Sequence, residues 1–290
     1  MSEANRPFRW DLVRPDQLGT LLDGVPAPDL PFLDQLTECA AKVLARSGGG
    51  EIHFVGRSLD SVYDLLSGAL DGTSWLSRIH QLPLSAAFAH WNRFNDQEIR
   101  QLRTNLTDAG VSPAAMAGRT QPTVLADLVS SGSTFAVLYH WLRDWIDDER
   151  VAWNVIRRKL RFLGVTCEYK TSPNTWRWQQ AHADWTVELP ASAIQNVSLE
   201  PGAWSYLADR QHKLTPTFSR RRWADENVRA PRHDERTRKA LAEAIALVEA
   251  GRRRHTRESL VRHLTAEPAM RERWLRSLVT ELRSAPNRPL

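Results

Sequence analysis

Twice along this chain a short apolar segment passes through a turn of small and polar residues directly into an amphipathic helix. The first unit joins residues 51–56 to a helix expected over 59–70, and the second joins residues 123–126 to a helix expected over 134–146. Strands that alternate with helices favour a parallel sheet with helices on both faces. The sequence therefore predicts an α/β fold with three layers and a mainly parallel sheet.

The remaining hydrophobic pattern extends this arrangement in both directions. It predicts helices over 31–46, 96–109 and 150–163, the last leading into 164–167, and further strands over 81–85 and 185–189. The chain then reads as irregular up to residue 230, and it becomes helical and highly charged from residue 233, with helices expected over 233–249, 256–264 and 268–283. We therefore divide the chain into an α/β domain over 1–230 and a helical C-terminal extension over 231–290.

Composition excludes several classes of protein. With 290 residues, 42% of them hydrophobic and 25% charged, the chain is typical of a globular protein that buries a large core. Its apolar stretches end well before the roughly 18 residues that span a bilayer, so we expect no membrane segment. Cys39 and Cys167 lie in apolar surroundings, which argues against a disulfide framework and favours a cytoplasmic protein. Composition leaves the oligomeric state open.

Charge is unevenly distributed along the chain. Residues 201–290 carry 20 Lys and Arg against 11 Asp and Glu. A basic segment is compatible with nucleic acid, with an anionic small substrate or with a solvated helix surface. Glutamates are interspersed among the arginines around 252–254, as on a solvated helix surface, so nucleic-acid binding is the less favoured interpretation. Motifs for zinc, for nucleophilic hydrolases and for phosphate loops of the Gly-Lys type are absent from the sequence.

The segment 124–134 carries the strongest chemical signal. An apolar strand delivers Asp127, and a turn rich in serine follows and opens a helix. A helix N-terminus at the carboxyl edge of a parallel sheet offers backbone amides and a positive dipole end to an anion. Simple helix capping needs one hydroxyl residue, whereas this turn supplies Ser130, Ser131, Gly132, Ser133 and Thr134. The pattern favours a phosphate site over a simple cap.

This segment resembles the phosphate-binding fingerprint of the type I phosphoribosyltransferases. The match covers about eleven residues, with Asp127 at the second acidic position and 130–134 at the loop that wraps the 5-phosphate of 5-phosphoribosyl 1-diphosphate (PRPP). The resemblance implies that Asp127 contacts the ribose or a magnesium ion, directly or through water. Ala126 replaces the first acid of the fingerprint, and Ser130 stands where purine-salvage members carry a carboxylate.

A second, looser match falls in the first strand–turn–helix unit. In this family a loop after the first core strand binds the diphosphate, and Gly56, Arg57 and Ser58 have the right character and order for it. Glycine allows the backbone to approach the diphosphate closely, and arginine pairs with diphosphate oxygens through two parallel hydrogen bonds. A surface arginine beside a capped helix is the alternative. Two anion-suited turns in family order favour the binding role.

Aromatic and basic residues gather again in the segment 204–223. We predict that this segment folds over the carboxyl ends of the strands as a hood that selects the acceptor; its candidate residues are Trp204, Tyr206, His212, Lys213 and Arg222. The alternative is a loop packed by aromatic rings with a solvated basic rim.

By resemblance, the chain is expected to be an enzyme that transfers a 5-phosphoribosyl group from PRPP to an unidentified acceptor, with Mg²⁺ and release of diphosphate. In that reaction Asp127 and Arg57 are the candidate catalytic residues. The alternative is a sensor of the same fold that binds PRPP or a nucleotide without catalysis, which the loss of an acid at Ala126 favours.

Overall fold

The computed structural model describes residues 10–85, 95–171, 177–218 and 231–285. Its centre is one five-stranded sheet in the order β2-β1-β3-β4-β5, and every neighbouring pair is parallel. The strands are β1 (Glu51–Val55), β2 (Ile79–Leu82), β3 (Thr123–Val129), β4 (Leu160–Cys167) and β5 (Ile194–Leu199). The predicted α/β class with a parallel sheet is confirmed.

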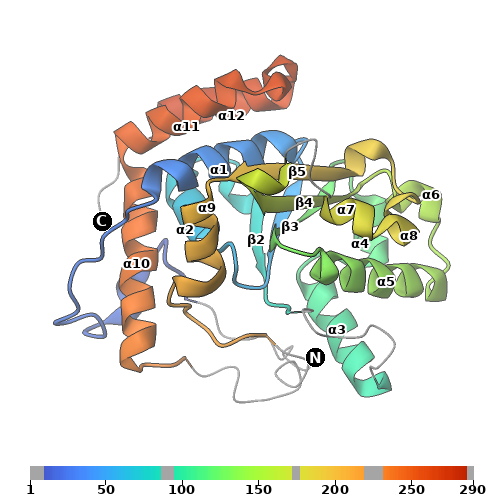
Figure 1. Ribbon diagram of the computed structural model, residues 1–290, viewed down its shortest axis with the longest axis horizontal. Coiled ribbons are helices and arrows are strands. Elements are labelled where there is room, and N and C mark those ends of the chain that lie inside the picture. Colours follow the sequence, from blue (N-terminus) through green and yellow to red (C-terminus); the bar gives the residue numbers. More distant parts are fainter. Residues whose placement is uncertain (1–9, 86–94, 172–176, 219–230, 286–290) are drawn as a thin grey trace.

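Helices cover both faces of this sheet (Figure 1). They are α1 (Leu33–Arg46), α2 (Asp60–Ala69), α3 (Asp96–Asp108), α4 (Pro113–Gly118), α5 (Ser133–Asp148), α6 (Trp153–Ile156), α7 (Trp178–Ala181), α8 (Ala183–Thr186), α9 (Pro201–Ser205), α10 (Glu235–Arg252), α11 (Arg254–Ala266) and α12 (Arg273–Ser284). A π-helical turn, η6 (Tyr206–Arg210), continues α9, and 3₁₀ turns lie at Pro15–Leu18, Leu76–Arg78, Glu168–Thr171, Ala191–Ala193 and Pro268–Arg271.

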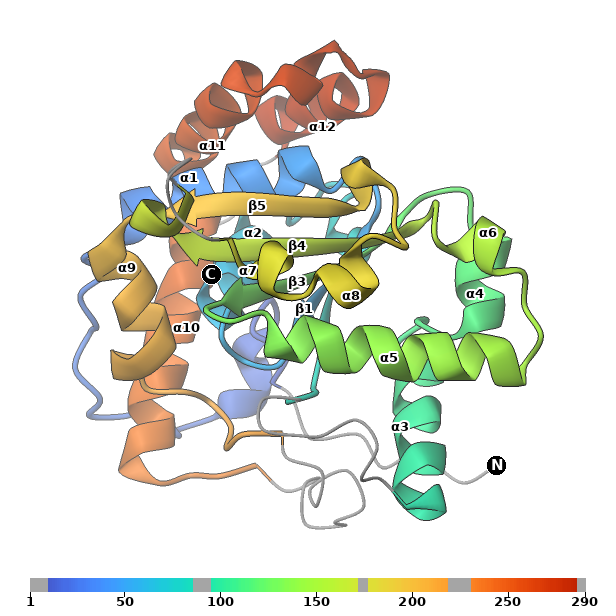
Figure 2. The same ribbon diagram turned by 45° about the vertical axis from the view of Figure 1, so that its right-hand side comes forward.

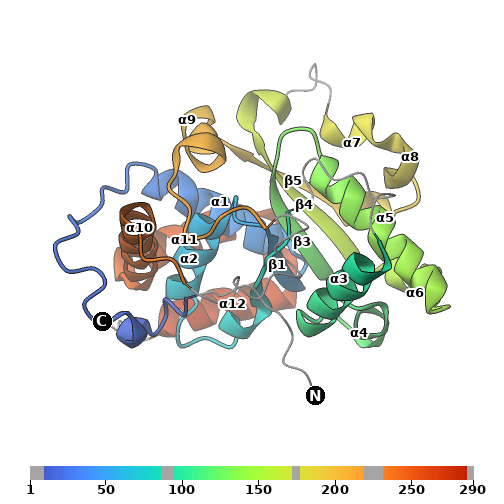
Figure 3. The same cartoon turned by 90° about the horizontal axis from the view of Figure 1, so that it is seen from below.

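The alternation of side chains along the strands produces two apolar cores. Ile52 and Phe54 of β1 join residues of α1 and α2 on one face, whereas Leu125 of β3 and Phe162 of β4 join residues of α5 on the other. In the view from below, α1 and α2 lie on one side of the strands and α3, α4 and α5 on the other (Figure 3). The layers are therefore those expected for a parallel sheet buried on both faces.

Two predicted elements were wrong, both in the second half of the sheet. The helix expected over 150–163 is instead the short α6 followed by β4. Most side chains of β4 are buried, alternately in the two cores, so the strand lacks the alternation of apolar and polar residues that would distinguish it from a helix in the sequence. The apolar residues expected on the buried face of that helix are instead buried by α6 and β4.

The strand expected over 185–189 is also absent. Trp185 belongs to α8, where its ring is 1% exposed and stacks on Tyr139 with 4.8 Å between centroids. The fifth strand is β5, within the stretch that reads as irregular. It lies at the edge of the sheet (Figure 2), and the polar residues Gln195, Asn196 and Ser198 conceal its strand character in the sequence.

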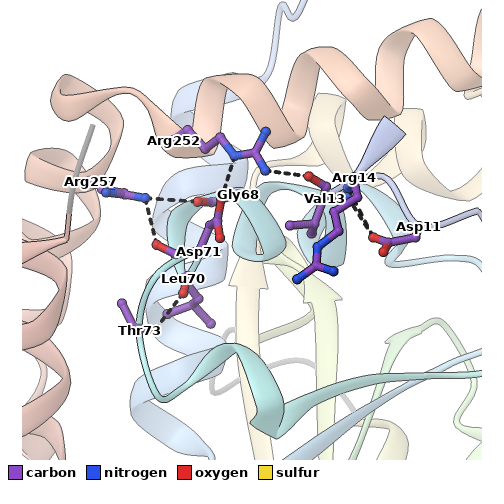
Figure 4. Close-up of polar contacts among 9 residues, drawn as sticks. All are labelled: Asp11, Val13, Arg14, Gly68, Leu70, Asp71, Thr73, Arg252 and Arg257. Carbon is purple, nitrogen blue, oxygen red and sulfur yellow. Dashed lines mark hydrogen bonds and ion pairs between the residues drawn. The ribbon is translucent and has the colours of Figure 1, made fainter. Parts of the chain in front are cut away.

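The C-terminal helices pack directly against the α/β core. Helix α10 crosses α2 at two glycines, since a Cβ on Gly68 would lie 1.8 Å from the Val248 carbonyl oxygen. Residues of α11 and α12 share one apolar cluster with α1. Figure 4 shows Arg252 donating to the Asp71 carboxylate and to the Val13 carbonyl, each hydrogen bond being 2.7–2.9 Å long. The division into units over 1–230 and 231–290 remains a prediction.

The order of the strands creates a switch point at β1. The chain moves from β1 to β2 on one side and then returns to place β3 on the other side of β1. In open parallel sheets, ligands bind in the crevice outside the carboxyl ends of strands at such a point. In the described ranges, none of the helices combines the length and apolar character needed to cross a bilayer.

Candidate functional site

A cavity of about 270 Å³ lies at the switch point, outside the carboxyl ends of β1 and β3. Three segments form its wall: the turn after β1, the end of β3 with the turn that follows it, and the residues after β2. The lining includes Gly56 and Ser58 from the first segment, Asp127 and the whole of 130–134 from the second, and Leu84 and Ser85 after β2. Of the residues expected to bind the donor phosphates, Arg57 is the exception, because it lines a neighbouring cavity.

The turn over 130–134 opens α5 without a side-chain cap. Gly132 occupies the N-cap position in the left-handed region, with φ of 83°, and no side chain caps the helix there. The nearest substitute is a long contact, 3.4 Å from the Ser133 amide to the Ser131 hydroxyl. The first-turn amides of Thr134 and Phe135 have no helical acceptor, and both residues line the cavity. The structure thus argues against capping as the reason for this run of serines.

Gly132 has a structural reason to be glycine, because aromatic packing leaves no room for a Cβ at this position. A Cβ at this position would lie 2.6 Å from the ring of Trp178, which packs against the turn from α7. The ring of Trp178 is itself held by a 2.6 Å hydrogen bond from its Nε1 to Asn196 of β5. The Trp178 ring therefore packs against the turn at Gly132 and restricts its conformation.

Two further polar side chains approach the turn: His182, whose functional role the sequence left open, and Lys170, which was not a predicted site residue. His182 Nε2 lies 2.9 Å from the carbonyl oxygen of Ser131, and Lys170 Nζ lies 3.5 Å from the hydroxyl of Ser130. Lys170 follows the carboxyl end of β4 by three residues. Recognition of β4 as a strand would have placed this lysine at the same edge as the two loops.

Asp127 lies within β3, two residues before the strand ends, and it is 6% exposed. Burial raises the pKa of this carboxyl group to about 8, although the Leu128 amide, the Lys213 ammonium group and the Thr134 hydroxyl all favour its ionised form. Its Oδ1 accepts a 2.8 Å hydrogen bond from the Leu128 amide. At neutral pH the side chain is therefore mostly a protonated acid, available as a hydrogen-bond donor.

This protonation state affects how well the cavity suits magnesium. Mg²⁺ is usually held by one or two ionised carboxylates together with substrate phosphates. Among the described residues that line the cavity, Asp127 is the only acid. The protein alone therefore fits Mg²⁺ poorly, and a metal would depend mainly on the phosphates of a bound ligand.

Ala126, where the phosphoribosyltransferase fingerprint has its first acid, is a core residue in this chain. It is 0% exposed and belongs to the apolar cluster on the α1 and α2 face, whereas its strand neighbours Leu125 and Val129 face the α5 side. An acidic side chain here would be buried among Ile52, Phe54 and Leu163 without a partner, at a cost of several kcal/mol. The alanine thus satisfies the packing of the sheet.

Arg57 joins the first loop to the segment over 211–218. Its guanidinium group donates to the Thr215 carbonyl at 2.7 Å and to the Thr217 hydroxyl at 2.8 Å. It lines a second cavity of about 510 Å³, which shares Ser58 and Ser85 with the first. The two cavities therefore meet at these serines.

Lys213 is the member of the predicted hood that reaches this region. It lines the second cavity, and its Nζ lies 2.7 Å from Gln211 Oε1 and 3.5 Å from the Ser58 carbonyl. Burial lowers the pKa of Lys213 to about 8, against the opposing effect of the nearby Asp60 carboxylate. The segment is also attached to the strand edge by a 2.9 Å hydrogen bond from the Ser85 amide to the Phe218 carbonyl.

The other hood residues lie elsewhere. Trp204 packs against the larger apolar core. Tyr206 contacts Phe32 with tilted rings and donates a 2.9 Å hydrogen bond to Glu243 of α10. Neither residue lines the two cavities. His212 is exposed beside Arg236, and Arg222 lies outside the described residues.

Comparisons with family models, with curated proteins and with solved structures found no match to this chain. The phosphoribosyltransferase resemblance therefore depends on the motif residues and on their arrangement in space. That arrangement offers amides, hydroxyls and cations along two joined cavities at one edge of a parallel sheet. Such an edge is suited to an extended ligand with anionic groups at both ends.

Proposed function

We propose that the two joined cavities bind PRPP and that the protein transfers its 5-phosphoribosyl group to an acceptor, releasing diphosphate. One observation carries this proposal. The sequence predicted two phosphate-binding turns, one over 130–134 and one at Gly56 and Ser58. The two turns are distant in the sequence, and they line the same cavity in the folded protein. A donor with phosphate groups at both ends requires two such cradles.

The volumes support a ligand that occupies both cavities. Pockets for small molecules measure about 300–1,000 Å³. The first cavity, at about 270 Å³, is slightly smaller than this range, and the second, at about 510 Å³, lies within it. In the proposed complex the 5-phosphate binds at the α5 N-terminus, and the diphosphate extends past Ser58 toward Arg57 and Lys213.

Catalysis in this proposal consists of positioning and charge stabilisation. Bond cleavage at the ribose C1 leaves the diphosphate with the bonding electron pair, and the acceptor forms the new bond at that carbon. Arg57 and Lys213 stabilise the departing diphosphate, and the protonated Asp127 donates to a ribose hydroxyl. Mg²⁺ is proposed to bind together with the diphosphate, because the cavity at the α5 N-terminus supplies only one acid among the described residues, Asp127.

The test is calorimetric titration of PRPP into the protein with and without Mg²⁺. Asp127→Asn preserves a hydrogen-bond donor and should retain affinity within about threefold, whereas Ser131→Ala and Lys213→Met should each weaken binding about tenfold or more, the loss of one charge-assisted or loop hydrogen bond. Ser77→Ala is the matched control, since this exposed serine donates only to the Ser74 carbonyl outside both cavities. Equal affinity in all four variants would contradict the assignment of the site.

A PRPP- or nucleotide-binding sensor is the second candidate, and the burial of Ala126 in the core is the observation that favours it. With one acid in the cavity, the protein could retain phosphate affinity and lack the full catalytic set. The two candidates differ in turnover. Release of diphosphate from bound PRPP in the presence of small-molecule extract supports the transferase, and tight binding without release supports the sensor.

A further inference from the structure

A second group of chemically reactive side chains lies near the other end of β1. Glu51 and His53 are two residues apart on this strand and share one face of the sheet, and His80 of β2 pairs in register with His53. In the described part of the chain, one ligand atom from each of these residues lies within 4.8 Å of the other two. The imidazole rings stack with 4.9 Å between their centroids.

His53 is the unusual member of this group. It is 0% exposed, and neither ring nitrogen has a hydrogen-bond partner among the described residues. Buried polar atoms in folded proteins are nearly always paired, because an unsatisfied one costs about 1–3 kcal/mol. A bound metal ion would satisfy one of these nitrogens, and none of the described neighbours does so.

The surroundings supply the other requirements of a metal site. His80 Nε2 lies 3.6 Å from Glu51 Oε2, so an imidazole and a carboxylate already converge. Glu51 and His80 both line a cavity of about 500 Å³, which also contains Asp108 and Asn105 of α3 and gives access from solvent. Arg119 lies 3.0 Å from Glu51 Oε2 and orients that carboxylate.

We propose that Glu51, His53 and His80 form a binding site for a divalent transition-metal ion of the zinc class. Two imidazoles and one carboxylate bind ions of the zinc class in preference to Mg²⁺ or Ca²⁺, which favour oxygen ligands. Three protein ligands leave a coordination position open toward the cavity, for water or for an exogenous ligand.

The geometry requires a modest closure on binding. An ion with bonds of 2.0–2.1 Å in tetrahedral geometry places its ligand atoms about 3.4 Å apart, so ligand atoms that now lie within 4.8 Å of one another must approach by up to about 1.4 Å. Glu51 and His80 are both partly exposed and can rotate toward the fixed ring of His53. The positive charge of Arg119 opposes the ion, which predicts moderate affinity in place of the very tight binding of a closed structural site.

The experiment is zinc binding to the full chain without a histidine tag, measured by competition with a chromophoric chelator, and the visible spectrum after titration with Co²⁺. The parent should bind one equivalent, and its cobalt spectrum should show the intense bands of four-coordinate geometry. His80→Ala and Glu51→Gln should each bind zinc at least about 100-fold more weakly than the parent. Loss of a residue that only hydrogen-bonds to a metal ligand already lowers metal affinity by about 10–100-fold. Both positions are partly exposed, so both variants should fold, which circular dichroism checks.

The control is His140→Ala, which removes a histidine outside the cluster whose Nε2 lies 3.8 Å from the Asp184 carboxylate. It should bind zinc like the parent, as should Asp127→Asn, because the cluster is separate from the phosphate cavity. No stoichiometric zinc binding by the parent, or parental affinity in His80→Ala, would overturn the proposal. Either result would leave the donor titration unaffected, so the two proposals succeed or fail separately.

Discussion

Asp127 shows how the fold changes the chemistry of one residue. Within β3 its carboxyl group is almost completely buried, and burial raises its pKa to about 8. The phosphoribosyltransferase resemblance implied that Asp127 contacts the ribose or a magnesium ion, and it left the protonation state of the side chain open. The structure makes it a proton donor at neutral pH, because the cost of burying a charge exceeds the stabilisation from the Leu128 amide and the Lys213 ammonium group.

This raised pKa predicts a pH-dependent gain in stability for Asp127→Asn. In the unfolded chain the carboxyl group ionises near pH 4, whereas in the folded protein it keeps its proton up to about pH 8. Rising pH therefore favours unfolding across this window, by at most about 1.4 kcal/mol per pH unit. Urea unfolding at pH 5 and pH 7 should show an advantage for Asp127→Asn that grows with pH.

Asp29→Asn, at an exposed position, serves as the control for that experiment, and its difference from the parent should be the same at both pH values. A constant difference for Asp127→Asn as well would show that the carboxyl group is ionised in the folded protein. The hydrogen-bond role proposed for it toward ribose would then be wrong.

At the scale of elements, the contact between α2 and α10 depends on two glycines. A Cβ on Gly251 would lie 2.2 Å from the Leu65 carbonyl oxygen and 2.7 Å from the Ala69 amide nitrogen, both of them backbone atoms of the opposite helix. Backbone cannot move aside as a flexible side chain can. The helices therefore approach each other more closely than any larger residue would allow.

Gly251→Ala should accordingly destabilise the protein by about 1–3 kcal/mol or more, the usual cost of overpacking. Gly118→Ala is the matched control, because it also lies in a helix but has nothing within 4 Å of the added Cβ. That change should be neutral or should stabilise by up to about 1 kcal/mol through helix propensity. Midpoints of urea unfolding measure both, and equal midpoints would show that α2 and α10 can separate without cost.

At the scale of the whole molecule, the C-terminal helices contribute to the core. Leu260, Leu275 and Leu278 are each at most 1% exposed and belong to the same cluster as Phe54 of the sheet. Burying one leucine side chain contributes about 1.5–3 kcal/mol, and the net stability of a domain is only about 5–15 kcal/mol. Removal of α11 and α12 would therefore expose more apolar surface than the fold can tolerate.

We predict that a chain ending at residue 253 shows no cooperative thermal transition and binds a hydrophobic dye at room temperature. The full-length Arg273→Ala variant, altered at an exposed position of α12, should melt like the parent. A cooperative transition in the shortened chain would mean that residues 1–253, including α10, fold without α11 and α12, and that these two helices are dispensable for the core.

The sequence by itself determined those elements whose periods are unambiguous. Amphipathic spacing gave α1, α3 and α5 to within two residues at each end, because one face of each helix is apolar and the other is polar. The turn over 130–134 was recognisable for a similar reason, since its composition of serine and glycine differs from what a simple cap requires. A strand buried on both faces, such as β4, and a strand with many polar residues at the edge of the sheet, such as β5, lack this difference between an apolar and a polar face.

Only the tertiary structure decided what the separate motifs form together. Strand order is set by long-range packing, so the sequence could not show that β1 and β3 are neighbours or that His53 pairs with His80. Burial is likewise a property of the assembled core. Ala126 and Asp127 lie on opposite faces of β3, so Ala126 is a packing residue of the core and burial raises the pKa of Asp127. Trp204 likewise packs in the core, whereas Lys213 lines the second cavity.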